Sequence, residues 1–179
     1  MSGGRWRRWQ RAALPHLVGR RVLDVGCGPG HFLSELIAAG YDAYGLEQST
    51  EMWAGASRRL ARKGQPGHLI AGDALELPFA DASFDALVLT FPPPFVRDAR
   101  FWSEAARVLG PSGRVVVVEG ATSNARLWPG ILERIWEALE GHARAPEETP
   151  VNGRLNARRI TTTTPDGTIW LIVADKTQT

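Results

Sequence analysis

Three glycines fall within five residues of one another in the stretch "LDVGCGPGHF": Gly26, Gly28 and Gly30. The stretch follows a short apolar run and leads into a helical pattern. Glycine at such a junction is typical of a backbone that turns sharply or that a ligand approaches closely. The sequence therefore predicts a ligand site at this turn.

Four carboxylates stand at or just after apolar runs with the pattern of buried strands: Asp24, Glu47, Asp73 and Glu119. The carboxyl ends of parallel strands meet at one edge of a sheet, where open α/β sheets bind ligands. Each carboxylate could instead cap a helix or a turn. Gathering all four at one edge is costly unless they hold something, so the set favours a ligand site.

The glycine spacing indicates a nucleoside ligand other than NAD. Gly26 and Gly28 fit the dinucleotide pattern G-x-G-x-x-G, but His31 occupies the third glycine position and Gly30 comes one place early. Glu47, about 20 positions further on, could accept hydrogen bonds from both ribose hydroxyls. No phosphate-binding loop ending in Gly-Lys-Ser/Thr is present.

The elements that must position these residues alternate between extended and helical patterns, which predicts an α/β fold with a mostly parallel sheet covered on both faces. The predicted strands cover residues 21–25, 42–46, 67–72, 84–90 and 113–119. The predicted helices cover 29–39, 50–63, 98–109 and an apolar stripe from 128 to 139. Residues 158–176 read as a hairpin around "PDG", and 143–156 as a long surface loop.

Length and composition are those of a single globular domain over residues 1–179, with 44% hydrophobic and 22% charged residues. There is no run of 18 apolar residues and no signal-peptide pattern. The one cysteine, Cys27, fits a reducing compartment, so we expect a cytoplasmic protein. The net charge is only +2, yet arginines concentrate near the start of the chain.

Four segments, in this order and spacing, carry a family resemblance: "VLDVGCGPGHF", "YGLEQS", "GDALELPFADASFDALVL" and "ARVLGPSGRVVVVEG". Together they resemble the class I S-adenosylmethionine-dependent methyltransferases. The similarity is greatest to the small-molecule "type 11" branch that includes the ubiquinone and menaquinone biosynthesis enzymes. The resemblance covers roughly residues 20–120. It implies a seven-stranded, Rossmann-like doubly wound sheet, mostly parallel with an antiparallel C-terminal hairpin.

The resemblance also implies S-adenosylmethionine as cofactor, with S-adenosylhomocysteine as product. In the family the glycine turn carries the methionine end of the cofactor. That role falls here to Asp24, Gly26, Cys27, Gly28 and Gly30. Cys27 reads as a small buried residue of the turn, because nothing basic is paired with it as a nucleophile would require.

The nucleoside end of the cofactor maps onto residues after the second and third strands. Glu47, with Gln48 beside it, corresponds to the acid that holds the ribose. Met52 corresponds to a residue that packs on the adenine, although it could equally be helix core. Asp73 matches the acid that accepts from the adenine amino group, and Ala74 the backbone amide that donates to a ring nitrogen.

Methyl transfer needs mainly an acceptor aligned with the methyl carbon, and such positioning can supply about 7–11 kcal/mol of the barrier. An oxygen acceptor also needs a base. The candidates are His16, His31, His142 and Glu119, of which Glu119 lies at the expected edge of the sheet and His31 follows the glycine turn. No catalytic base is assigned, and no metal site is predicted.

The stretch "LTFPPPF" follows the fourth strand. Thr90, which ends the strand, is counted with the cofactor residues. Methyltransferases that act on base amino groups or glutamine amides often carry Asn/Asp/Ser-Pro-Pro-aromatic here, but Pro92 stands where the polar residue would be. We therefore interpret the loop as a rigid floor of the acceptor site, with Phe91 or Phe95 against the substrate.

The segment 1–20 contains "RWRRW", with Trp6 and Trp9. Interleaved Arg and Trp could stack on RNA bases or lie on an anionic membrane surface. We favour a helical cap that closes the pocket through its tryptophans. The predicted function is methylation of a small-molecule acceptor. The alternatives are an RNA or protein N-methyltransferase and a catalytically silent cofactor-binding protein, and the oligomeric state stays open.

Overall fold

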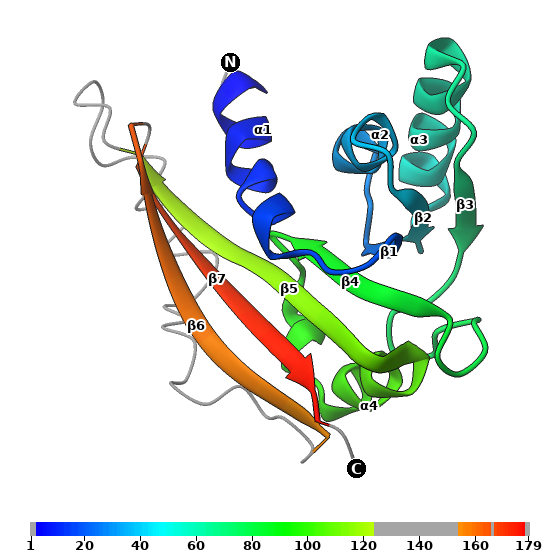
Figure 1. Cartoon of the computed structure of the whole chain (residues 1–179). Helices are drawn as coiled ribbons and strands as arrows, with labels where there is room; N and C mark the ends of the chain where they lie inside the picture. The colour runs from blue at the N-terminus through cyan, green and yellow to red at the C-terminus, as the bar shows by residue number, and fades with distance from the viewer. Residues whose placement is uncertain (1–2, 124–153, 166, 178–179) are drawn as a thin grey trace.

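The computed structural model describes residues 3–123, 154–165 and 167–177. In these residues the chain forms one seven-stranded sheet with the strand order β3-β2-β1-β4-β5-β7-β6 (Figure 1). The strands are β1 (Arg21–Val25), β2 (Asp42–Glu47), β3 (His68–Ala71), β4 (Phe84–Thr90), β5 (Leu109–Ser123), β6 (Leu155–Thr164) and β7 (Gly167–Lys176). The helices are α1 (Gly3–Arg11), α2 (His31–Ala38), α3 (Thr50–Lys63) and α4 (Ala99–Val108), with 3-10 turns η1 (Leu14–His16) and η2 (Pro94–Arg97).

The first five strands run parallel to one another, and β7 is antiparallel to both β5 and β6. The predicted fold, a mostly parallel doubly wound sheet that ends in an antiparallel hairpin, is confirmed. The N-terminal segment forms α1 and η1. That it acts as a cap over the pocket stays a prediction.

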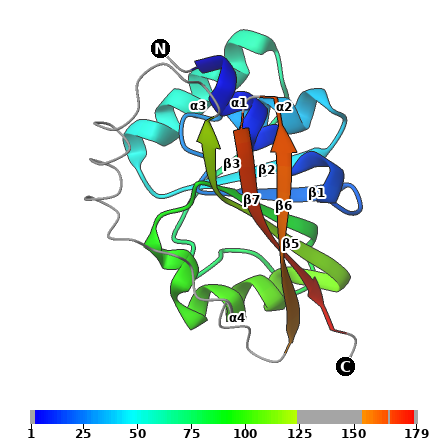
Figure 2. The same cartoon turned by 90° about the vertical axis from the view of Figure 1, so that its left-hand side faces the viewer.

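Helices cover the two faces of the sheet unequally. Figures 1 and 2 both show α1, α2 and α3 on one face and α4 on the other. Strand residues alternate between the two core layers because successive side chains point to opposite faces. Val22 packs with Phe32 of α2, whereas Leu23 packs in the cluster of Phe101 and Trp102 of α4. This burial on both faces explains why the central strands are almost wholly apolar.

Local signals fix the ends of α3 where the sequence predicts them. Ser49 caps its start by accepting from the backbone N–H of Met52 at 3.3 Å. Gly64 ends it with a left-handed φ of 60°. The start of α2 is different: the helix begins at His31, not at residue 29. Gly30, with φ 73°, belongs to the turn that precedes it.

Two other predicted boundaries are wrong. Strand β5 spans 109–123, longer than the predicted 113–119, because pairing continues across a register shift from Phe84–Leu109 to Ala86–Arg114. Its far end pairs with β7 up to Ser123. Residues 155 and 156, predicted as loop, begin β6. The predicted helix at 128–139 and residues 143–153 of the predicted loop lie outside the described residues.

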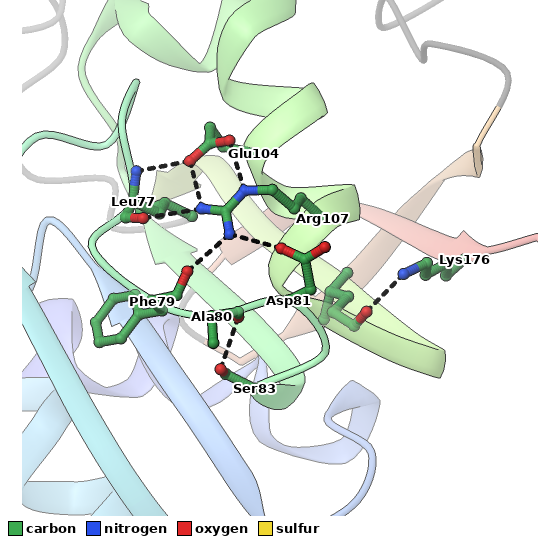
Figure 3. Close-up of polar contacts among 9 residues, drawn as sticks. Leu77, Phe79, Ala80, Asp81, Ser83, Glu104, Arg107 and Lys176 are labelled. Carbon is green, nitrogen blue, oxygen red and sulfur yellow. Dashed lines mark hydrogen bonds and ion pairs between the residues drawn. The ribbon is translucent and has the colours of Figure 1, made fainter.

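The segment between Asp73 and β4 is tied to α4 by one arginine (Figure 3). Arg107 donates to the carbonyl oxygens of Leu77 at 2.9 Å and Phe79 at 2.7 Å, and it pairs with Glu104 at 2.7 Å. Glu104 in turn accepts from the backbone N–H of Leu77 at 2.9 Å. Two charged side chains of α4 therefore hold the loop in place through its backbone.

Candidate cofactor site

The glycine turn wraps from β1 to the end of β2. The backbone N–H groups of Gly26 and Cys27 both donate to the carbonyl of Leu46, at 2.8 and 3.0 Å. Gly26 and Gly28 have φ values of 71° and 54°, which residues other than glycine rarely adopt. A Cβ added at either glycine would meet no heavy atom of the described residues within 4 Å. The turn thus exposes an open stretch of backbone to a ligand.

Gly30 is required for a different reason. A Cβ there would lie 2.9 Å from the Cβ of Ala56 on α3. This glycine lets α3 approach the start of α2 closely, and its φ of 73° also favours glycine. The structure gives Gly30 a packing role, and its predicted contact with a cofactor stays a prediction.

Glu47 is fixed at the end of β2 by two backbone groups. Its Oε2 accepts from the N–H of Gly28 and its Oε1 from the N–H of Ser49, both at 2.8 Å. Each carboxylate oxygen can accept a further hydrogen bond. The side chain therefore stands ready for a pair of hydroxyl donors beside the glycine turn.

Asp24 is the most unusual polar group of the site. It is 1% exposed, and its Oδ2 is buried without a hydrogen-bond partner among the described residues. Burial, and secondly the negative charge of Glu47, raise the pKa of Asp24 to about 7. A buried carboxylate oxygen without a partner is costly. A cationic donor placed at Oδ2 would remove that cost.

Gln10 of α1, which the sequence analysis did not single out, covers the same face of the sheet. It is buried, its Nε2 donates to Thr90 Oγ1 at 3.0 Å, and its Oε1 has no partner. Thr90 lies two residues beyond Val88, the register partner of Asp24, and so on the same face. The signal that could have found Gln10 is its helical spacing from Trp6 and Ala13, which puts an amide on the buried stripe of an amphipathic helix.

The predicted adenine-side residues follow β2 and β3, which are neighbours in the sheet. Met52 is 45% exposed in the first turn of α3, so it is not helix core. Gln48 is exposed, and Ala74 is buried. Asp73 is exposed and caps its own turn, where Oδ1 accepts from the N–H of Leu75 at 2.9 Å. The adenine contacts of these residues stay predictions.

Aromatic side chains meet where β4 leads into its proline loop. Trp6 stacks on Phe91 with ring centroids 4.0 Å apart, and Trp9 lies 6.3 Å from Phe91. Phe91 holds a φ of 52° while its N–H donates to the carbonyl of Val118. Phe95, in contrast, packs against Phe101 of α4. The structure brings Phe91, not Phe95, to the tryptophans.

Each of the two leading candidate bases contacts an arginine. Glu119 pairs with Arg159 of β6 at 3.1 Å. His31 Nε2 accepts from Arg59 at 2.9 Å, and burial together with the charge of Arg59 lowers the pKa of His31. Burial raises the pKa of the Cys27 thiol, with a further contribution from the nearby carboxylates, so this thiol is a poor nucleophile.

The other candidate bases are not assigned either. His16 is half-buried in η1, and its carbonyl accepts from Arg114. His142 lies outside the described residues. Among the residues that the structure describes, no three His, Cys, Asp or Glu side chains are grouped as metal ligands, and no helix is long and apolar enough to cross a membrane.

Comparison with known proteins assigns the family. The family model described as "Methyltransferase domain" matches residues 23–117, more than half of the chain. The chain therefore belongs to the methyltransferase-domain family, within the class I S-adenosylmethionine-dependent methyltransferases. The resemblance found in the sequence is confirmed.

Two relatives are demethylmenaquinone methyltransferases. The protein of Beutenbergia cavernae is 40% identical over 126 residues, which are 68% of this chain and 51% of that protein. The protein of Mycobacterium sp. (strain KMS) is 37% identical over 147 residues, which are 81% of this chain and 61% of that protein. The chain thus spans about half to three fifths of the length of these curated relatives.

Solved structures share the fold at low sequence identity. The YcgJ protein from Bacillus subtilis matches with a TM-score of 0.69 at 19% identity, over 97% of this chain and 100% of that one. Geranyl diphosphate C-methyltransferase from Streptomyces coelicolor matches with a TM-score of 0.69 at 18% identity, over 95% of this chain and 80% of that one.

Proposed function

We propose that this chain binds S-adenosylmethionine and transfers its methyl group to a small apolar acceptor. Family membership supports the proposal, and one observation in the structure carries it: the buried, unpartnered Oδ2 of Asp24 beside the glycine turn. A carboxylate in this position suits the ammonium group of an amino acid ligand, because a charge-assisted hydrogen bond offsets its desolvation.

The residues around the turn fit the rest of the cofactor. Gly26 and Gly28 let the backbone approach the methionine end, since nothing occupies the space beside them. Glu47 has one backbone donor on each oxygen and can accept the two ribose hydroxyls as well. Met52 offers an exposed apolar side chain for the adenine. The remaining proposed contacts are Cys27, Gly30, Gln48, Asp73, Ala74 and Thr90.

When bound, the cofactor supplies an electrophilic methyl group on a positively charged sulfur. The task of the protein is then to orient the acceptor and to exclude water. Trp6, Trp9 and Phe91 present an apolar aromatic surface for this purpose. Since no base has been assigned, an acceptor that is already electron-rich, and whose proton leaves to solvent after the methyl transfer, fits the site best.

The name of the relatives makes a demethylmenaquinone, supplied in its reduced quinol form so that the ring is electron-rich, the first acceptor to test. The experiment is calorimetric titration with S-adenosylhomocysteine, followed by a methyl-transfer assay with that acceptor. We expect micromolar affinity, and we expect Glu47→Ala to weaken it by about tenfold or more through the loss of charge-assisted hydrogen bonds. No binding to the folded protein would refute the proposal. Binding without transfer to any apolar acceptor would favour a cofactor-binding protein without catalytic activity.

A further inference from the structure

The two flanks of α1 differ in chemistry. Gln10 lies on the buried side of the helix. Trp6 and Trp9 lie on one flank, facing Phe91. Arg7 and Arg11 lie one turn apart on the other flank, and Arg11 pairs with Glu35 of α2 at 2.8 Å. The helix therefore stands between an aromatic surface and a basic one.

Arg7 of α1 lies near three basic side chains of α3. We call the four the cationic cluster: Arg7, Arg59, Arg62 and Lys63. Arg59 donates to the carbonyl of Pro29 at 2.8 Å, and Lys63 donates to Ser34 Oγ at 2.7 Å. These contacts anchor two of the basic side chains on neutral groups of the α2 region.

The charges of the cationic cluster act on one another. Burial, and then the positive charges of Arg62 and Arg7, lower the pKa of Arg59. Within the described part of the chain, none of the four side chains forms an ion pair. Arg7, Arg62 and Lys63 are exposed. A surface with like charges this close together is complementary to a partner with many negative charges.

The aromatic flank adds an apolar component to the same surface. Trp6 is 39% exposed although its ring stacks on Phe91. Figure 1 shows α1 beside α2 and α3 on one face of the sheet, so the indole and the basic side chains belong to one layer. Tryptophan next to arginine is the combination that anchors peripheral proteins at the boundary between lipid headgroups and acyl chains.

We propose that α1 and the cationic cluster form a docking surface for an anionic lipid bilayer, which delivers an apolar acceptor to Trp6 and Phe91. The delivery step rests on the proposed function, whereas membrane binding does not. Charge complementarity selects the anionic partner. A bilayer fits better than RNA because the ring of Trp6 already stacks on Phe91. Proteins that bind single-stranded RNA instead present several free aromatic rings on which successive bases stack.

Co-sedimentation of the full chain with lipid vesicles tests the proposal. We expect binding to vesicles of phosphatidylcholine with a quarter phosphatidylglycerol, little binding to pure phosphatidylcholine, and a loss of binding at high salt. Each basic residue near an anionic surface contributes about fivefold to the partition coefficient. Arg7→Ala with Arg62→Ala should therefore lower it by about 25-fold, and Trp6→Ala should lower it further.

A matched control removes two exposed arginines that do not belong to the cationic cluster, by Arg20→Ala with Arg154→Ala. Arg20 directly precedes β1 and Arg154 precedes β6, at the edge where the parallel strands begin. This double variant loses the same amount of charge as the Arg7/Arg62 variant. We expect its partition coefficient to lie within about twofold of the wild-type value, since only the position of the lost charge differs.

Circular dichroism shows that each variant is folded, and S-adenosylhomocysteine binding, measured on every variant, separates the two proposals. Vesicle binding without binding of this ligand would refute the proposed function and leave the docking surface supported. Ligand binding without vesicle binding would overturn the docking surface alone. Equal losses in the Arg7/Arg62 and Arg20/Arg154 variants would also overturn it. So would binding of a single-stranded RNA oligonucleotide in place of vesicles.

Discussion

The pKa of Asp24 leads to a prediction for how cofactor binding depends on pH. In the ligand-free protein this pKa is raised from 3.8 to about 7. An ammonium group binds the ionised carboxylate, so binding must first remove the proton from Asp24 wherever it is protonated. The affinity for S-adenosylhomocysteine should therefore fall as the pH falls below about 7.

The size of the effect follows from the ionised fraction. With a pKa of about 7, Asp24 is about three quarters ionised at about pH 7.5 and about 3% ionised at about pH 5.5. The dissociation constant should rise about 25-fold over this interval, which corresponds to about 2 kcal/mol. The amino group of the ligand stays protonated throughout, so it does not contribute to the slope.

Calorimetry gives two independent readouts. Besides the dissociation constant, titrations at about pH 6 in buffers of different ionisation enthalpy report the released proton, which should approach about 0.9 per site. The control is Asp24→Asn, which cannot ionise and should bind weakly with a flat pH profile. A wild-type constant that changes less than about threefold, or an equally steep profile in Asp24→Asn, would refute the assignment of Asp24 to the ammonium group.

Further predictions concern stability and the turn. Because the folded pKa of Asp24 lies above its unfolded value, the free energy of unfolding should fall by about 3 kcal/mol between about pH 4 and pH 7. Chemical denaturation should find ligand-free Asp24→Asn more stable than the wild type at pH 8, and a less stable variant would contradict this. Arg107→Ala leaves the hydrogen-bonded oxygens of Glu104 and the loop without their donor, and should lower the free energy of unfolding by about 2 kcal/mol. A decrease of less than about 0.5 kcal/mol, measured by unfolding in urea, would show that the network is dispensable. Gly30→Ala should destabilise the fold by about 1–3 kcal/mol through its φ and its contact with Ala56, and an unchanged melting temperature would argue against that packing role.

Much of the architecture could be predicted because its signals are local. The apolar runs that became β1, β2 and β4 are continuous in the sequence, and Ser49 and Gly64 mark the ends of α3 within a few residues of it. The family motifs likewise lie in short segments between residues 20 and 120. Periodicity, capping and turn preferences act over one or two turns of chain, so the sequence by itself determined the order and type of these elements.

The contacts that define the site were decided by the tertiary structure. Gln10 meets Thr90 across 80 positions of sequence, and Arg159 reaches Glu119 across 40. Neither pair has a local signal, because only the packing of α1 and the pairing of β5, β7 and β6 bring the side chains together. The carboxyl group of Asp24 was visible in the sequence, but the lack of a partner at its Oδ2 was not. That depends on how completely the layers of the fold exclude water from Oδ2, which is a property of three-dimensional packing.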